Sequence, residues 1–130
     1  MIRPRFGAPL AAAVLAFCTV AALAAPPQPF TAEAFNQLAH AGKPIVVDVA
    51  ASWCTTCMAQ KPIIDQLSRQ AAYRDVAVLV VNFDDKDLLR QLKVSVQSTL
   101  IAFKGGREVA RSIGDTSVSG INRIFEKAAQ

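Results

Sequence analysis

The sequence predicts an α/β domain in which a central mixed β-sheet is covered by helices on both faces. Short apolar runs rich in β-branched residues alternate with segments whose apolar residues recur at helical spacing. Two strands joined by a Gly-rich turn then close the pattern. The resulting order is helix, strand, helix, strand, helix, strand, strand, helix. Such alternation places the strands in one sheet between two layers of helices.

The first half of the pattern contains two helices and two buried strands. Thr31 can cap a helix that runs to about residue 40. Residues 45–51 form an apolar run interrupted only by Asp48, and this run is too short for a typical helix. A second helical pattern starts near residue 54 and continues to about residue 70. Residues 76–81 are again almost wholly apolar, which predicts a second central strand.

The second half contains a short helix, a hairpin and a last helix. Asp84 and Asp85 predict the start of the short helix, because acidic side chains are favourable at helix N-termini. Residues 99–103 form a third strand, and the turn at 104–107 joins it to a returning strand at 108–113. Either Ser117 or Ser119 can cap the last helix.

Composition and charge restrict the class of function. With 52% hydrophobic and 18% charged residues, the chain is typical of a globular protein and not of a disordered one. Its 130 residues allow one domain and hardly more. The net charge is +4, but the basic residues are scattered and form no run of adjacent Lys and Arg. We therefore expect no nucleic-acid partner.

Residues 1–24 are typical of a secretory signal peptide. Two arginines precede an apolar stretch that is shorter than the about 20 residues of a transmembrane helix. Small residues predict cleavage after Ala24, and retention as an uncleaved anchor stays open as an alternative. We expect residues 25–29 to form a flexible Pro-rich lead and residues 30–130 to form a single domain in the bacterial periplasm.

The cysteines Cys54 and Cys57 fall at the junction between a strand and a helix. Residues three apart lie on one helix face, so their sulfurs can bond to each other. Free N–H groups and the partial positive charge of the helix end favour a thiolate at Cys54. Cys57, one turn further along, should be more shielded. An exposed nucleophile with a shielded partner is suited to thiol–disulfide exchange.

Other uses of a Cys-x-x-Cys pair have less support in the sequence. A structural zinc site needs four ligands, and His40 is the only histidine. Haem attachment needs a histidine directly after the second cysteine, where Met58 stands. We therefore expect no cofactor and no metal. Two alternatives stay open: two chains that pool their cysteine pairs around zinc or an iron–sulfur cluster, and a binding module without turnover.

The chain resembles the thioredoxin family over about residues 30–128. The residues that carry the resemblance are Val46-Val47-Asp48, Trp53-Cys54-Thr55-Thr56-Cys57, Pro62 and Phe103-Lys104-Gly105-Gly106. It implies a thioredoxin-like fold and a dithiol/disulfide exchange activity. It also implies that Cys54 is the attacking nucleophile and that Cys57 resolves the mixed disulfide.

The resemblance implies roles for residues around the pair as well. Trp53 would shape the surface that substrates meet, and Thr55 and Thr56 would contact substrate and tune the potential. Asp48 matches the family's buried acid, which takes the proton from Cys57 during resolution. Desolvation in an apolar strand should hold this carboxyl partly protonated, which suits a proton shuttle.

The sequence departs from the family pattern in two places. Gln97-Ser98-Thr99 stands where the family usually has a cis-proline before the Thr that opens the third strand, and we expect this stretch to contact substrate. A cis bond before Ser98 would cost about 2.5–4 kcal/mol, so we expect a trans bond and a reshaped loop, with the Ser98 hydroxyl near Cys54. In the second strand, Val80 falls where the family often has a Lys that pairs with the buried acid.

Together these observations predict a periplasmic thiol:disulfide oxidoreductase that works in the reducing direction. The expected substrates are disulfides or oxidised thiols of exported proteins. Because an oxidising compartment drains a reductant, we expect a membrane electron donor as a partner. We also expect a monomer. The alternative within the same fold is a disulfide donor, which runs the exchange in reverse.

Overall fold

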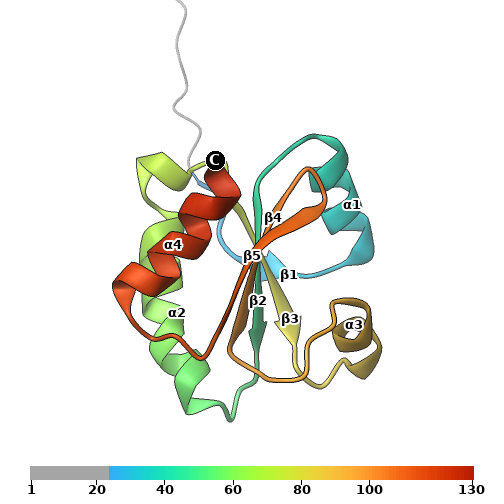
Figure 1. The fold of residues 1–130 in the computed structure, drawn as a ribbon, viewed down its shortest axis with the longest axis vertical. Helices are drawn as coiled ribbons and strands as arrows, with labels where there is room; N and C mark the ends of the chain where they lie inside the picture. The colour runs from blue at the N-terminus through green and yellow to red at the C-terminus, as the bar shows by residue number, and fades with distance from the viewer. Residues whose placement is uncertain (1–23) are drawn as a thin grey trace, which may run out of the picture.

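The computed structural model describes residues 24–130 and has the α/β architecture that the sequence predicts (Figure 1). Its elements are β1 (Gln28–Pro29), α1 (Ala32–His40), β2 (Ile45–Ala50), α2 (Thr55–Ser68), a 3₁₀ helix (Ala71–Tyr73), β3 (Ala77–Asn82), α3 (Lys86–Gln91), β4 (Thr99–Lys104), β5 (Arg107–Ile113) and α4 (Val118–Ala129). The predicted signal peptide lies outside the described residues except for Ala24. Among the described helices, none is long and apolar enough to cross a membrane.

The five strands form one mixed sheet in the order β1-β3-β2-β4-β5. β3 is parallel to both β1 and β2, whereas β4 is antiparallel to β2 and β5. The parallel pair β2 and β3 is joined through α2, as expected for a crossover connection, and β4 and β5 form the predicted hairpin. Since β2 lies at the centre of the sheet, the residues that follow it emerge from the middle of the sheet edge.

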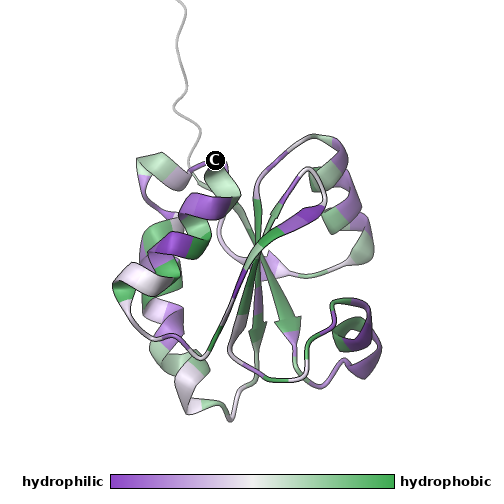
Figure 2. Ribbon diagram, viewed as in Figure 1, coloured by the Kyte–Doolittle hydropathy of each residue, from purple (hydrophilic) through white to green (hydrophobic). Residues whose placement is uncertain are grey.

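Two apolar cores lie on opposite faces of the sheet, which is covered by α2 and α4 on one face and by α1 and α3 on the other (Figure 1). In Figure 2 the hydrophobic residues concentrate on the strands between these two layers. The core beside α2 and α4 includes Val46, Ile64, Leu67, Val78, Leu100, Ile121 and Phe125. The opposite core includes Ile45, Val47, Val49, Leu79, Ile101 and Phe103, packed against Phe35 and Leu38. Because side chains alternate along a strand, Asp48 shares the face of Val46 and lies beneath α2.

Side-chain caps fix where the helices begin. The Thr31 hydroxyl accepts a hydrogen bond from the Ala34 N–H at 3.0 Å, and the Asp85 carboxylate accepts one from the Leu88 N–H at 3.0 Å. Ser117, rather than the alternative Ser119, caps α4. Each cap satisfies a backbone donor that the first helical turn leaves without a partner.

The prediction of a flexible lead over residues 25–29 is wrong at its end. Gln28 and Pro29 form β1, which pairs with Leu79 and Val80 of β3. A two-residue strand shows no alternation, so nothing in the sequence pattern could reveal it. Pro29 is tolerated because β1 lies at the sheet edge, where a missing N–H breaks no ladder on the solvent side.

Candidate active site

The two cysteines lie where β2 leads into α2, and they are joined by a disulfide with their Cα atoms 5.3 Å apart. Cys54 is the N-cap of α2, and its sulfur accepts a hydrogen bond from the Cys57 N–H at 3.0 Å. The predicted placement of both residues is therefore confirmed. In the reduced protein, this amide and the positive end of the helix stabilise negative charge on the Cys54 sulfur.

The predicted difference in exposure between the cysteines is wrong for the disulfide form. Cys54 is 3% exposed and Cys57 is 6% exposed, so neither is open to solvent. The two differ instead in what surrounds them: Cys54 receives the amide hydrogen bond, whereas Cys57 lines a cavity that is open to solvent. Beside them, Trp53 and Met58 are each more than half exposed, which leaves an apolar surface around the disulfide.

Asp48 is a buried carboxyl on the strand beneath α2. It is 9% exposed, and its Oδ1 has no hydrogen-bond partner among the described residues, so this Asp does not face water. Burial raises the pKa of Asp48 to about 6, against an opposing effect of the Lys61 charge. Val80 lies directly opposite Asp48 in β3. This is the position where the family often has a Lys that pairs with the buried acid, and Val80 cannot form that pair.

A cavity of about 510 Å³ connects this carboxyl with the second cysteine. Asp48 and Cys57 both line it, together with Lys61, Asp65 and Asp84 from the surrounding elements. The Asp48 carboxyl and Cys57 therefore both lie on the wall of one pocket.

The pair Lys61 and Asp65 was not identified from the sequence. The Lys61 Nζ lies 2.7 Å from the Asp65 Oδ2, one helical turn apart on α2. Lys61 lowers and Asp65 raises the pKa of Asp48. The sequence did carry a signal, because an oppositely charged i,i+4 pair one turn beyond Cys57 must lie near the cysteines.

The loop before β4 holds Ser98 in an unusual backbone conformation. No cis peptide bond occurs within residues 24–130, so the expected trans bond between Gln97 and Ser98 is confirmed. Ser98 has φ +58°, in the left-handed region. Its N–H donates to the Val49 carbonyl at 2.8 Å, and its hydroxyl donates to the Gln97 carbonyl. The hydroxyl is thus hydrogen-bonded within the loop, and its expected place near Cys54 stays a prediction.

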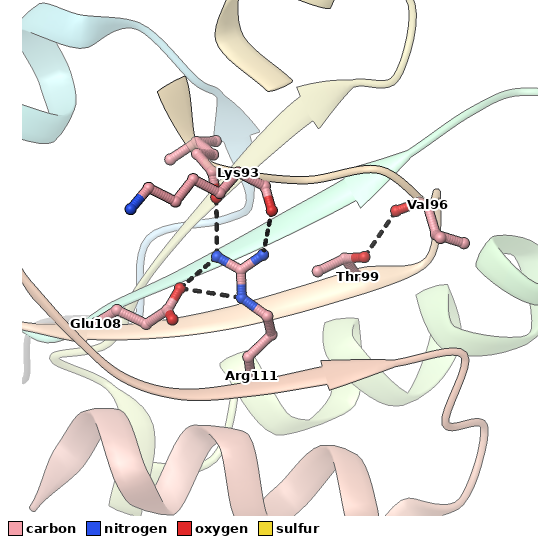
Figure 3. A network of polar contacts seen from close by, with 6 residues as sticks. Lys93, Val96, Thr99, Glu108 and Arg111 are labelled. Atoms are coloured by element: carbon pink, nitrogen blue, oxygen red, sulfur yellow. Dashed lines mark hydrogen bonds and ion pairs between the residues drawn. The ribbon is translucent and has the colours of Figure 1, made fainter. Parts of the chain in front are cut away.

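The other residues predicted to contact substrate differ in accessibility. Trp53 and Thr55 are exposed, and Thr56 and Gln97 are half-buried. Thr99 is buried, and its hydroxyl donates to the Val96 carbonyl at 2.7 Å (Figure 3). Thr99 therefore stabilises the loop from within, whereas the substrate contacts of the other four stay predictions.

Arg111 braces the start of the same loop from β5. Its guanidinium donates to the carbonyl oxygens of Leu92 and Lys93 at 2.8 and 2.9 Å and also pairs with Glu108 (Figure 3). Lys93 has φ +54°, so the chain turns sharply where Arg111 holds it. Together, Arg111 and Thr99 fix the path of the segment that leads to Ser98.

The described residues contain no cluster of three or more His, Cys, Asp or Glu side chains that could hold a metal ion.

Trp53 packs edge-to-face against Phe83, with ring centroids 6.2 Å apart. The arrangement can support disulfide chemistry: an oxidised cysteine pair at a helix N-terminus, a buried titratable carboxyl and an apolar rim.

Comparison with known proteins gives consistent matches. The family model described as Thioredoxin matches residues 27–127. Thioredoxin-2 of Saccharomyces cerevisiae is 38% identical over 80 residues, which cover 61% of this chain and 75% of that protein. The thioredoxin of Chlamydia caviae is 36% identical over 98 residues, which cover 75% of this chain and 93% of that protein.

Solved structures match as well. Trxlp from Edwardsiella tarda EIB202 superposes with a TM-score of 0.74 at 44% identity, covering 76% of this chain and 97% of that chain. Thioredoxin NaTrxh from Nicotiana alata superposes with a TM-score of 0.71 at 27% identity, and the match covers 82% of this chain and 96% of that chain.

Proposed function

Since the chain belongs to the thioredoxin family of thiol–disulfide oxidoreductases, we propose that it reduces disulfides of exported proteins in the periplasm. The observation that carries the proposed mechanism is the cavity that the Asp48 carboxyl and Cys57 both line. The apolar rim formed by Trp53 and Met58 supports a protein substrate, because such a surface can pack against side chains around a substrate disulfide.

The proposed reaction proceeds by two exchanges. The Cys54 thiolate attacks one sulfur of the substrate disulfide, so the substrate bond breaks, a mixed disulfide forms and the other substrate sulfur leaves as a thiolate. Cys57 then passes its proton to the Asp48 carboxylate and attacks the Cys54 sulfur. The mixed disulfide breaks, the second substrate sulfur leaves, and the pair ends as the Cys54–Cys57 disulfide. Two electrons have moved from the cysteine pair to the substrate.

The apolar N-terminal sequence supports an exported location. In an oxidising compartment the reduced pair must be regenerated, and we propose a membrane electron donor for that step. Fractionation of cells that express the full chain tests the location. A periplasmic product whose N-terminus is Ala25 is expected, and a full-length cytoplasmic product would overturn this part of the proposal.

The direction of the reaction is tested by the reduction potential of the cysteine pair. A reductase should have a value near the about −270 mV that thioredoxin shows, measured by equilibration with glutathione or dithiothreitol buffers. A value of about −150 mV or above would reject the reductase and favour the disulfide donor.

The substrates can be identified by trapping. The Cys57→Ala variant cannot resolve its mixed disulfide and should accumulate exported proteins bound to Cys54. The matched control is the variant that carries Cys54→Ala in addition, which should trap none. If both variants capture the same proteins, the proposed attack by Cys54 is wrong.

A further inference from the structure

A buried amide lies one helical turn beyond the second cysteine. Gln60 is only 1% exposed, and its neighbours along the inward face of α2 are Cys57, Ile64 and Leu67. Burying an amide among apolar groups costs about 1–3 kcal/mol unless it finds partners. The hydrogen bonds of its Nε2 offset part of this cost, whereas its Oε1 is buried without a hydrogen-bond partner among the described residues.

The Gln60 side chain connects two loops that are far apart in sequence. Its Nε2 donates to the Asp115 carbonyl at 2.9 Å and to the Ser98 carbonyl at 3.3 Å. Ser98 ends the loop before β4, and Asp115 lies between β5 and α4. The Gly114 N–H donates to the same Ser98 carbonyl at 2.9 Å. One amide thus links α2 to both loops.

The Asp115 end of this link is held by the first turn of α4. The Asp115 Oδ1 accepts hydrogen bonds from the N–H and the hydroxyl of Ser117, which caps α4. A Cβ atom at Gly120 would lie only 1.7 Å from the Asp115 Oδ2, so the helix packs closely against this side chain. Asp115 is therefore a fixed point from which Gln60 can hold the other loop.

Ser98, the other residue that Gln60 contacts, has a backbone conformation that its surroundings must maintain. A non-glycine residue in the left-handed region costs about 1–2 kcal/mol and persists only where its surroundings impose it. The Val49 carbonyl that accepts from the Ser98 N–H is also 4.0 Å from the Cys57 sulfur. A movement of Ser98 would therefore displace or free a carbonyl that lies beside the Cys57 sulfur.

We propose that Gln60 is a positioning residue for disulfide exchange: its amide ties the helix that carries the cysteines to the Ser98 loop and keeps that loop seated beside Cys57. The inference rests on the proposed function, in which a protein substrate must fit beside this loop. A loosened loop weakens binding of a protein substrate, but it leaves the attack of Cys54 on a small disulfide unchanged.

The test uses Gln60→Met, which keeps the length of the side chain and removes both donors. We expect the Gly114 and Ser98 amides to exchange hydrogen about tenfold faster, as the loss of about 1.4 kcal/mol predicts. We expect kcat/KM for the disulfides of insulin to fall by about the same factor, mainly through KM. The rate with a small aromatic disulfide should stay within about twofold of the wild type.

The matched control is Ser68→Ala on the same helix. Ser68 is also buried, but its hydroxyl donates to the Asp65 carbonyl within α2 and touches neither loop. This variant should leave loop exchange and the insulin KM unchanged. If Gln60→Met behaves like Ser68→Ala in both measurements, the proposed role of Gln60 is wrong.

A second variant keeps the inference testable if Gln60→Met does not fold. Gln60→Glu preserves shape, and its introduced carboxyl can donate a hydrogen bond only when protonated. At each pH, the hydrogen-exchange rate of the Gly114 amide in the variant is divided by the rate in the wild type. This ratio should fall toward one as the pH falls, because the protonated carboxyl can donate again. A ratio that does not change with pH would overturn the inference. A wild-type protein inactive on insulin would instead refute the proposed function.

Discussion

The side chain that decides how the proposed reaction depends on pH is the carboxyl of Asp48. Burial raises its pKa to about 6, so at pH 7 most molecules carry a carboxylate that can accept the Cys57 proton. Asp48→Asn removes this base. We expect release of the mixed disulfide to slow by about 10–100-fold at pH 7 and to lose its inflection near pH 6. Single-turnover kinetics from pH 5 to 8 measure both effects, and an unchanged profile would exclude Asp48 as the acceptor.

The Lys61–Asp65 pair on α2 should adjust that pKa in opposite directions. Lys61→Met removes a positive charge and should raise the pKa of Asp48, whereas Asp65→Asn removes a negative charge and should lower it. The Lys61 side chain is 70% exposed and the Asp65 side chain 27%, so the shift in Lys61→Met should stay below about one pH unit and shrink in high salt, whereas the shift in Asp65→Asn should be less sensitive to salt. Carboxyl ¹³C NMR titration of Asp48 measures these shifts. Shifts of the same sign in both variants would contradict this electrostatic account.

At the level of elements, the loop between α3 and β4 depends on a side chain from β5. Arg111 supplies hydrogen bonds to two backbone carbonyls at the end of α3 (Figure 3). Arg111→Met keeps the aliphatic part and removes these bonds. We expect a loss of about 1–2 kcal/mol in the free energy of unfolding and faster hydrogen exchange at Val94. Glu108→Gln is the control: it weakens the ion pair but leaves both carbonyl contacts, and an equal effect would show that the ion pair dominates.

The elements that could be predicted from sequence are those with local signals. Periodicity, the cap Thr31 and the acidic residues Asp84 and Asp85 located the helices, because these signals lie within one helical turn of the helix start. The strand β1 was missed because its order comes from pairing with β3, far along the chain. The Ser98 backbone was predicted only as trans, since its positive φ depends on contacts from other elements.

The same distinction applies to the site. Cys54, Cys57 and Asp48 were identified because the spacing of two sulfurs and a lone charge in an apolar strand are visible in the sequence. Gln60 and Arg111 were not identified, since their partners are backbone carbonyls of remote loops. Backbone carbonyls carry no sequence signal, so only the fold could reveal such links.

For the molecule as a whole, the ionised Asp48 carboxyl that the proposed reaction needs lowers the stability of the folded protein. An acid whose pKa rises on folding binds its proton more tightly in the folded state. Its contribution to stability is full below the unfolded pKa of 3.8 and is lost as the pH rises through about 6. A difference of about two pH units corresponds to about 3 kcal/mol, which is a large share of the about 5–15 kcal/mol that stabilises a domain.

Urea unfolding of the oxidised protein at pH 3.5 and 7.5 tests this coupling. The wild type should lose about 3 kcal/mol of stability relative to Asp48→Asn between these two values, because only the wild type must ionise a buried carboxyl. Comparing the change with pH cancels the fixed cost of burying an amide in the variant. The other carboxyls titrate in both proteins and cancel as well. Parallel stability curves would show that Asp48 ionises as easily in the folded protein as in water, and the cavity could then not favour proton transfer from Cys57 in the proposed way.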